Sequence, residues 1–153
     1  MFSPKGRSLL LVFFLLSLPL LSAQSSQEAG GLVDPASLVG LTLDELISRF
    51  GTPRSVYAAR GLEEWQDDVV FVYEQGDFYI YKDRVWQLGL KAARGLKAGD
   101  SRGVVFLILG SKAESRGDSI FFSLDEKPWP LMLRCDFDSE GKLVVIFIYR
   151  PDF

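Results

Sequence analysis

One short stretch constrains the fold of this chain more than any other, because it carries both the start and the stop signals of a helix. Residues 38–53 read Leu-Val-Gly-Leu-Thr-Leu-Asp-Glu-Leu-Ile-Ser-Arg-Phe-Gly-Thr-Pro. Thr42 and Glu45 have the spacing of a capping box, in which each side chain accepts a hydrogen bond from the other residue's backbone N–H. Gly51 suits the left-handed residue that ends a helix, and Pro53 blocks its continuation. A helix of two turns is unstable alone in water, so it must pack on another element.

A second segment follows the same pattern. Aligning Gly110 with Gly51 places Ser101 on Thr42, at an offset of 59 residues, and such an offset is a reason to look for a repeat. Residues 104–109 are six consecutive apolar residues, which propensity alone would assign to a strand. The aligned cap and closing glycine favour a helix instead. Because such a helix is apolar on every side, we expect it to be sandwiched inside the molecule.

Each helix is followed by sequence typical of antiparallel strands. The β-branched and aromatic runs are separated by short polar turns, and they occupy residues 69–74, 78–82, 84–90, 119–124, 131–137 and 143–149. This order predicts an α+β fold of two helix-plus-antiparallel-meander repeats, with the helices packed on one face of the sheet. The first repeat is expected at 34–92 and the second at 93–153, together in one compact unit.

The start of the chain has the pattern of a secretory signal peptide. A basic beginning precedes an apolar run at 9–21, and Ala23 is the small residue that suits the cleavage site. The apolar run is shorter than the roughly 20 residues of a bilayer span, which favours cleavage over a retained anchor. We therefore predict a signal peptide at 1–23, a flexible leader at 24–33 and a periplasmic or secreted protein without a membrane span after cleavage.

The composition argues against several functions. The net charge of −3, without a basic cluster, argues against nucleic acid as a partner. The chain has no histidine, which removes the commonest general base and the commonest metal ligand. Cys135 alternates with apolar residues in a strand and is expected to be a buried structural cysteine. We therefore expect no catalytic residue, no cofactor and no metal.

Acidic side chains cluster twice, and each cluster has a functional alternative. Glu63, Glu64, Asp67 and Asp68 suggest a hydrolase, although glycoside hydrolysis needs two carboxylates held across a cleft, and a solvated loop is the favoured interpretation. Residues 136–140 resemble the start of a calcium loop. Apolar residues follow where further oxygen ligands would be needed, so a polar hairpin turn is favoured.

Aromatic residues are the better functional candidates. Tyr and Trp are enriched at protein interfaces because one end is apolar and the other polar. We predict that an aromatic sheet face binds another envelope or secreted protein, with Trp65, Tyr73, Tyr79, Tyr81 and Trp86 as candidate binding residues. The alternative is a small-ligand or sugar-binding module, which requires a pocket lined by Trp65 or Trp86.

The two helix segments carry a family resemblance. They read Gly-Leu-Thr-Leu-Asp-Glu-Leu…Phe-Gly-Thr-Pro at 40–53 and Gly-Leu-Lys-Ala-Gly-Asp-Ser-Arg…Val-Val…Ile-Leu-Gly at 95–110. They resemble the helix signature of the BamE/SmpA outer-membrane lipoproteins and of the β-lactamase-inhibitor-protein (BLIP) fold. The resemblance implies a tandem repeat of helix-plus-sheet units and binding to proteins rather than catalysis. The chain lacks the lipid-bearing cysteine of the BamE group, and residues 64–88 also resemble an uncharacterised bacterial secreted family.

Overall fold

The computed structural model describes most of the chain after the predicted leader, namely residues 33–60, 67–124 and 128–152. They belong to one compact unit, Leu32–Phe153. The predicted signal peptide at 1–23 lies outside the described residues, and so does the predicted leader apart from its last residue, Val33. No helix within the described ranges has the length and apolarity that a membrane crossing needs.

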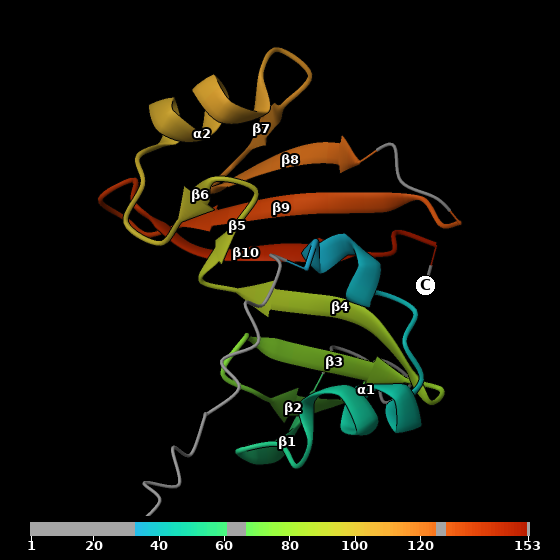
Figure 1. Ribbon diagram of the computed structural model, residues 1–153. Helices are drawn as coiled ribbons and strands as arrows, with labels where there is room; N and C mark the ends of the chain where they lie inside the picture. The colour runs from blue at the N-terminus through green and yellow to red at the C-terminus, as the bar shows by residue number, and fades with distance from the viewer. Residues whose placement is uncertain (1–32, 61–66, 125–127, 153) are drawn as a thin grey trace, which may run out of the picture. The chain divides into compact units, whose positions relative to one another are not determined.

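Eight antiparallel strands form one continuous sheet, in the order β1-β2-β3-β4-β10-β9-β8-β7 (Figure 1). The strands are β1 (Ser55–Ala59), β2 (Asp68–Val72), β3 (Asp77–Tyr81), β4 (Arg84–Leu90), β7 (Glu114–Arg116), β8 (Ser119–Leu124), β9 (Leu131–Phe137) and β10 (Leu143–Tyr149). A separate two-stranded sheet joins β5 (Ala92–Ala93) and β6 (Leu96–Lys97). The central pairing of β4 with β10 joins the earlier four strands of the large sheet to the later four.

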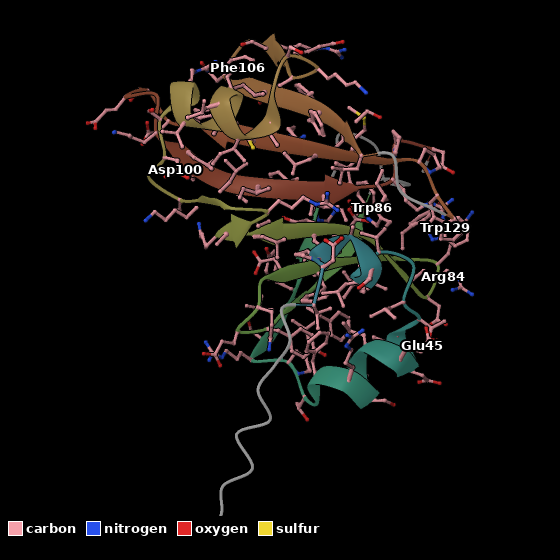
Figure 2. The ribbon with its side chains drawn as sticks, turned by 45° about the horizontal axis from the view of Figure 1, so that its top comes forward. Glu45, Arg84, Trp86, Asp100, Phe106 and Trp129 are labelled. Atoms are coloured by element: carbon pink, nitrogen blue, oxygen red, sulfur yellow. The ribbon has the colours of Figure 1, made fainter. Side chains whose placement is uncertain are left out.

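The helices are short and begin at the predicted caps. They are the 3₁₀ helix η1 (Pro35–Leu38) and the α-helices α1 (Leu43–Phe50) and α2 (Arg102–Leu109). Glu45, labelled on α1 in Figure 2, completes the capping box: its Oε2 accepts from the Thr42 N–H at 2.8 Å, and its own N–H donates to Thr42 Oγ1 at 3.2 Å. Ser101 Oγ accepts from the Val104 N–H at the start of α2. The prediction of a helix at 104–109 is therefore confirmed.

A single core lies between the helices and one face of the large sheet. Leu46 of α1 and Val105 of α2 are both 0% exposed, and each is the one buried residue of its helix. They belong to the same cluster as the inward residues of the strands, which include Phe78, Ile80, Val85, Leu88, Ile120, Leu133, Cys135, Ile146 and Ile148. Since each α-helix buries only one side chain, the sheet supplies most of the core.

The prediction of two helix-plus-meander repeats is wrong. Leu88 pairs with Ile148 and Leu90 with Ile146 across the β4–β10 ladder, so one sheet and one core run through the supposed boundary. The architecture is mostly antiparallel sheet, with two short α-helices among the described residues. The tandem-repeat interpretation fails with it, because the helix caps on which it rested are local signals that say nothing about how the strands pair.

The prediction that α2 is sandwiched inside the molecule is also wrong. Val105 is buried, whereas Leu107 is 83% exposed and Val104, Phe106 and Ile108 are 37–43% exposed. The helix lies on the surface with only one side toward the core. It therefore leaves apolar side chains in solvent, where a charged face would be usual.

The capping box predicts a dependence of stability on pH. The hydrogen bond from the Thr42 backbone, with a smaller contribution from the Thr42 hydroxyl, lowers the pKa of Glu45 below its ordinary value of 4.5. Because the pKa is lower in the folded state, the stabilisation is complete above pH 4.5 and is lost as the pH falls through the folded-state value. Urea unfolding should show that Glu45→Ala destabilises the protein at pH 7 and that this difference shrinks toward pH 2.5. Asp44→Ala, which removes an exposed carboxylate from the same first turn, is the control; an equal pH dependence there would contradict the prediction.

Candidate protein-binding surface

The face of the large sheet away from the helices is the candidate site, and we call it the open face. Cross-strand partners lie on the same side of a sheet, so the register identifies its residues. One row crosses the sheet through Tyr57, Val70, Tyr79, Gln87, Tyr149, Met132 and Ser123. The next row runs through Asp77, Gly89, Phe147, Arg134, Phe121 and Glu114. In β3, β4, β8, β9 and β10 the residues that alternate with these rows belong to the core or pack against it, which places the two rows on the side away from the described helices. Val70, a member of the first row, is itself 0% exposed.

Three side chains pack side by side near the centre of the open face. The rings of Tyr79 and Phe147 meet edge to face, with centroids 6.2 Å apart, and the Arg134 guanidinium lies 4.4 Å from the Phe147 centroid. Gly89 lies beneath the two rings: a Cβ there would be 3.4 Å from Phe147 Cε1 and 3.6 Å from Tyr79 Cε2. The absence of a side chain at Gly89 therefore leaves room for both rings close to the backbone of β4. We call Tyr79, Phe147 and Arg134 the central triplet.

Arg134 is the charged member of the central triplet. Its Nε lies 3.1 Å from Asp136 Oδ1, but it is buried and makes no directed hydrogen bond, so this contact is an ion pair without good donor geometry. Asp136 Oδ1 instead accepts a hydrogen bond from Ser119 Oγ at 2.6 Å. No described residue accepts a hydrogen bond from the terminal nitrogens of Arg134, whose side chain is 32% exposed. A guanidinium held against an aromatic ring with free donors suits recognition of a partner's acceptor groups.

Three of the residues predicted for binding lie on this side of the sheet. Tyr79 and Tyr81 alternate with the buried residues of β3 and are half-buried. Trp86 of β4 is also half-buried, and its indole N–H donates to Asp68 Oδ1 at 3.0 Å. Since Asp68 lies two residues from Val70 on β2, this bond places the Trp86 indole on the open face.

Tyr73 does not belong to the candidate surface, in contrast to the prediction. It is 6% exposed, packs against Phe50 and Phe78, and donates its hydroxyl hydrogen to the Gly51 carbonyl at 3.1 Å. It contributes to the core because it follows β2 at the point where α1 covers the sheet. Trp65 lies outside the described residues.

Sequence reasoning missed Phe147, Tyr149 and Arg134. The signal was present, because core residues alternate with half-buried ones throughout β9 and from Ile146 to Tyr149 in β10. Successive side chains of a strand point to opposite faces of the sheet. Arg134 therefore points away from the face on which its neighbour Cys135 is buried, and Phe147 points away from the face on which its neighbour Ile148 is buried. What the sequence could not show is that β10 pairs with β4, which brings Phe147 beside Tyr79.

The environment of Tyr79 leads to a spectroscopic prediction. The pKa of Tyr79 is raised from 10.0 to about 12. Burial is the largest cause, and the neighbouring Tyr57 and Asp77 add smaller effects. In a phenolate absorbance titration of the folded protein, one tyrosine should therefore ionise near pH 12, and Tyr79→Phe should remove that step. If Tyr79→Phe instead removes a step near pH 10, the ring is not packed as described.

The other candidate chemical groups that the structure describes make structural contacts. Asp67 is exposed and lies 3.8 Å from Arg60, while Asp68 is held by Trp86, and burial raises its pKa. Glu63 and Glu64 lie outside the described residues. Cys135 is buried, as predicted, and burial followed by the Asp136 charge raises the pKa of its thiol to about 12. A thiol in this state is a poor nucleophile.

Residues 138–142 form the predicted hairpin turn, whereas Asp136 belongs to β9. Asp138 Oδ1 accepts hydrogen bonds from the backbone N–H groups of Glu140 at 2.9 Å and Lys142 at 2.8 Å. Within the described ranges, no group of three or more histidine, cysteine, aspartate or glutamate side chains is placed to hold a metal ion. Through its two hydrogen bonds to the backbone, the Asp138 carboxylate orders the turn between β9 and β10.

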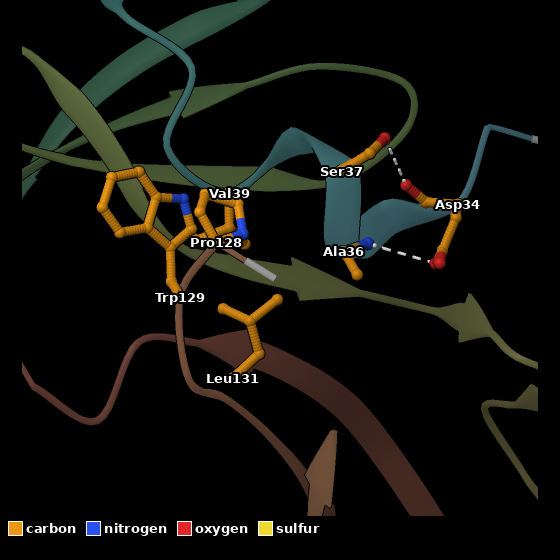
Figure 3. A pocket seen from close by; sticks show the side chains of 7 residues that line it. All are labelled: Asp34, Ala36, Ser37, Val39, Pro128, Trp129 and Leu131. Atoms are coloured by element: carbon orange, nitrogen blue, oxygen red, sulfur yellow. Dashed lines mark hydrogen bonds between the residues drawn. The ribbon is translucent and has the colours of Figure 1, made fainter. Parts of the chain in front are cut away.

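A cavity of about 260 Å³ lies on the helix side of the sheet, between η1 and the start of β9. Figure 3 shows its lining residues, which are Asp34, Ala36, Ser37, Val39, Pro128, Trp129 and Leu131. Its polar groups are already paired: Asp34 accepts from the Ala36 N–H and from Arg94, and Ser37 Oγ donates to the Asp34 carbonyl. Trp86 does not line it, and Trp65, the other residue named for the small-ligand alternative, lies outside the described residues.

No protein-family model and no curated protein matches this sequence. Among solved structures, the fold is similar to an extracellular protein containing an SCP domain from Bacillus anthracis, with 14% identity and a TM-score of 0.50 over 78% of this chain and 46% of that one. A cysteine-rich secretory protein from Staphylococcus aureus has 13% identity and a TM-score of 0.48, over 79% of this chain and 47% of that one. The chain thus spans about half the length of these structures. At such identity the likeness concerns the fold alone.

These matches correct the resemblance drawn from the sequence. The fold is similar to that of an SCP-domain protein, so the assignment to a BamE-like or BLIP-like family is wrong. The residues behind that assignment were helix caps and closing glycines. Such signals recur wherever a short helix precedes a strand, and they are too general to identify a family.

Proposed function

We propose that this chain is an exported, non-enzymatic protein that binds another exported protein through the open face. The observation that carries the proposal is the central triplet, where Tyr79, Phe147 and Arg134 pack together on a face without helices. Tyr, Trp and Arg are the residues most enriched among binding hot spots, and hot spots cluster near the centre of an interface. The absence of histidine and the buried, high-pKa Cys135 support a role without catalysis.

Export is supported by two independent observations. The sequence begins with the pattern of a signal peptide. The fold is similar to that of an extracellular protein. We propose a periplasmic or secreted location on this basis, with the partner in the same compartment.

The test compares capture of a partner by the purified protein and by two variants. Arg134→Glu reverses the charge at the centre of the open face, whereas Leu107→Glu places the same charge on the exposed side of α2. Loss of a hot-spot residue lowers affinity by about thirtyfold or more, and we expect this for Arg134→Glu. Leu107→Glu should bind as the unaltered protein does. Loss of binding in Leu107→Glu with binding retained in Arg134→Glu would assign the interface to α2 and overturn the proposal.

A further inference from the structure

The two edges of the large sheet are built differently. β7 is three residues long, and its Arg116 and Glu114 form an ion pair at 2.7 Å. Shortness and charge are the usual protection of an edge strand against pairing with another chain. β1 has neither protection: it is five residues long, Ser-Val-Tyr-Ala-Ala, without a charge, a proline or a register shift against β2. Among the described strands it pairs only with β2.

The side chains of β1 are also exposed. Val56 is 50% exposed and Tyr57 is 45% exposed. Tyr57 pairs with Val70, which pairs in turn with Tyr79, so Tyr57 lies on the open face in the same row as Tyr79. A strand added at this edge would therefore continue the row of residues that crosses the open face.

We propose that β1 accepts an extended segment of the partner as a ninth strand, and that this segment has an uncharged centre with a carboxylate at each end. The proposal rests on the proposed function, since it names how the same partner engages the sheet. In such strand addition, backbone hydrogen bonds supply affinity and alternate side chains supply specificity. The basic residues Arg54 and Arg60 flank β1, with side chains 65% and 81% exposed, and they are placed to meet the two carboxylates.

The same two residues argue against a second copy of this chain as the occupant. Antiparallel pairing of two β1 strands centred on Tyr57 would place Arg54 of one copy opposite Arg60 of the other, at both ends. Like charges directly opposite each other destabilise a strand pair. Each arginine also has a carboxylate of its own chain nearby, which offsets this repulsion only in part. Glu74 is 3.0 Å from Arg54, and Asp67 is 3.8 Å from Arg60.

The experiment follows the backbone amide signals of the isotope-labelled protein by NMR during titration with two capped peptides. One is Asp-Val-Thr-Val-Thr-Val-Asp and the other is Lys-Val-Thr-Val-Thr-Val-Lys, with the same strand propensity. We expect the aspartate peptide to shift amides 55–59 and to leave 114–116 unchanged. It should bind about fivefold more tightly than the lysine peptide at low salt, because two exposed ion pairs contribute a few tenths of a kcal/mol each.

Two variants complete the test. Ala58→Pro removes an edge N–H and should abolish the shifts, while Ser115→Pro at the opposite edge should not. Arg54→Glu combined with Arg60→Glu leaves the strand intact and should reverse the preference toward the lysine peptide. Equal binding of both peptides, shifts confined to other strands, or dimerisation through residues 55–59 would each overturn the proposal. Partner capture that survives Ala58→Pro but not Arg134→Glu would reject strand addition while leaving the proposed function standing.

Discussion

Phe78→Ala is expected to lower the free energy of unfolding by about 3–5 kcal/mol, which is a large part of the stability of a domain of this size. Phe78 is 0% exposed, and its ring lies 5.5 Å from that of Phe50 and 5.3 Å from that of Tyr73. Because Phe50 is the last residue of α1, the substitution removes both core volume and the surface on which this helix rests. Chemical denaturation followed by circular dichroism measures the loss.

The control makes the same substitution on the surface. Phe106 of α2 is 37% exposed, and Phe106→Ala should cost about 1 kcal/mol or less. The difference between the two variants isolates the contribution of burial, since the side chain removed is the same. Equal losses in both variants would mean that the ring cluster of Phe50, Tyr73 and Phe78 is not the anchor of α1.

Gly76→Ala is expected to destabilise the protein by about 2–6 kcal/mol, because backbone strain and steric overlap act together. Gly76 has a φ of +150°, a conformation that L side chains rarely adopt. A Cβ there would lie 2.5 Å from the Gly89 carbonyl oxygen and 2.7 Å from Leu90 Cδ2. The backbone of β4 must therefore move, and Gly89 supports the rings of Tyr79 and Phe147.

Gly141→Ala is the matched control for this substitution. Gly141 also has a positive φ, of +72°, but a Cβ there would meet no heavy atom within 4 Å. It should cost only the conformational strain, about 1–2 kcal/mol. Thermal unfolding of both variants separates strain from overlap; a Gly76→Ala protein as stable as Gly141→Ala would show that β4 does not approach the turn so closely.

Local features of the fold were predictable from the sequence. Thr42 with Glu45, and Ser101 with Gly110, mark both α-helices because caps depend on residues only a few positions apart. The predicted runs correspond closely to β2, β3, β4, β8, β9 and β10, since alternation reports burial on one face. β7 was not predicted, because its three residues, Glu-Ser-Arg, have no apolar alternation.

Features that depend on distant pairing were not predictable. The β4–β10 ladder joins segments about 60 residues apart, and nothing within either strand specifies the other. The role of Gly89 is hidden for the same reason, since its space is filled by Phe147 from that distant strand. The exposure of Leu107 was missed because a strongly apolar helix normally indicates burial, and here it does not.

The central claim is that the open face contacts a partner, and site-specific photocrosslinking tests it most directly. A photoreactive amino acid replaces Tyr81 on the open face in one protein and Leu107 on α2 in another, and both are irradiated with exported proteins of the same cell. A partner bound to the open face should give a discrete crosslinked product from position 81, absent when Arg134→Glu is also present, and none from position 107. A product from position 107 alone, or one at position 81 that persists with Arg134→Glu, would contradict this claim.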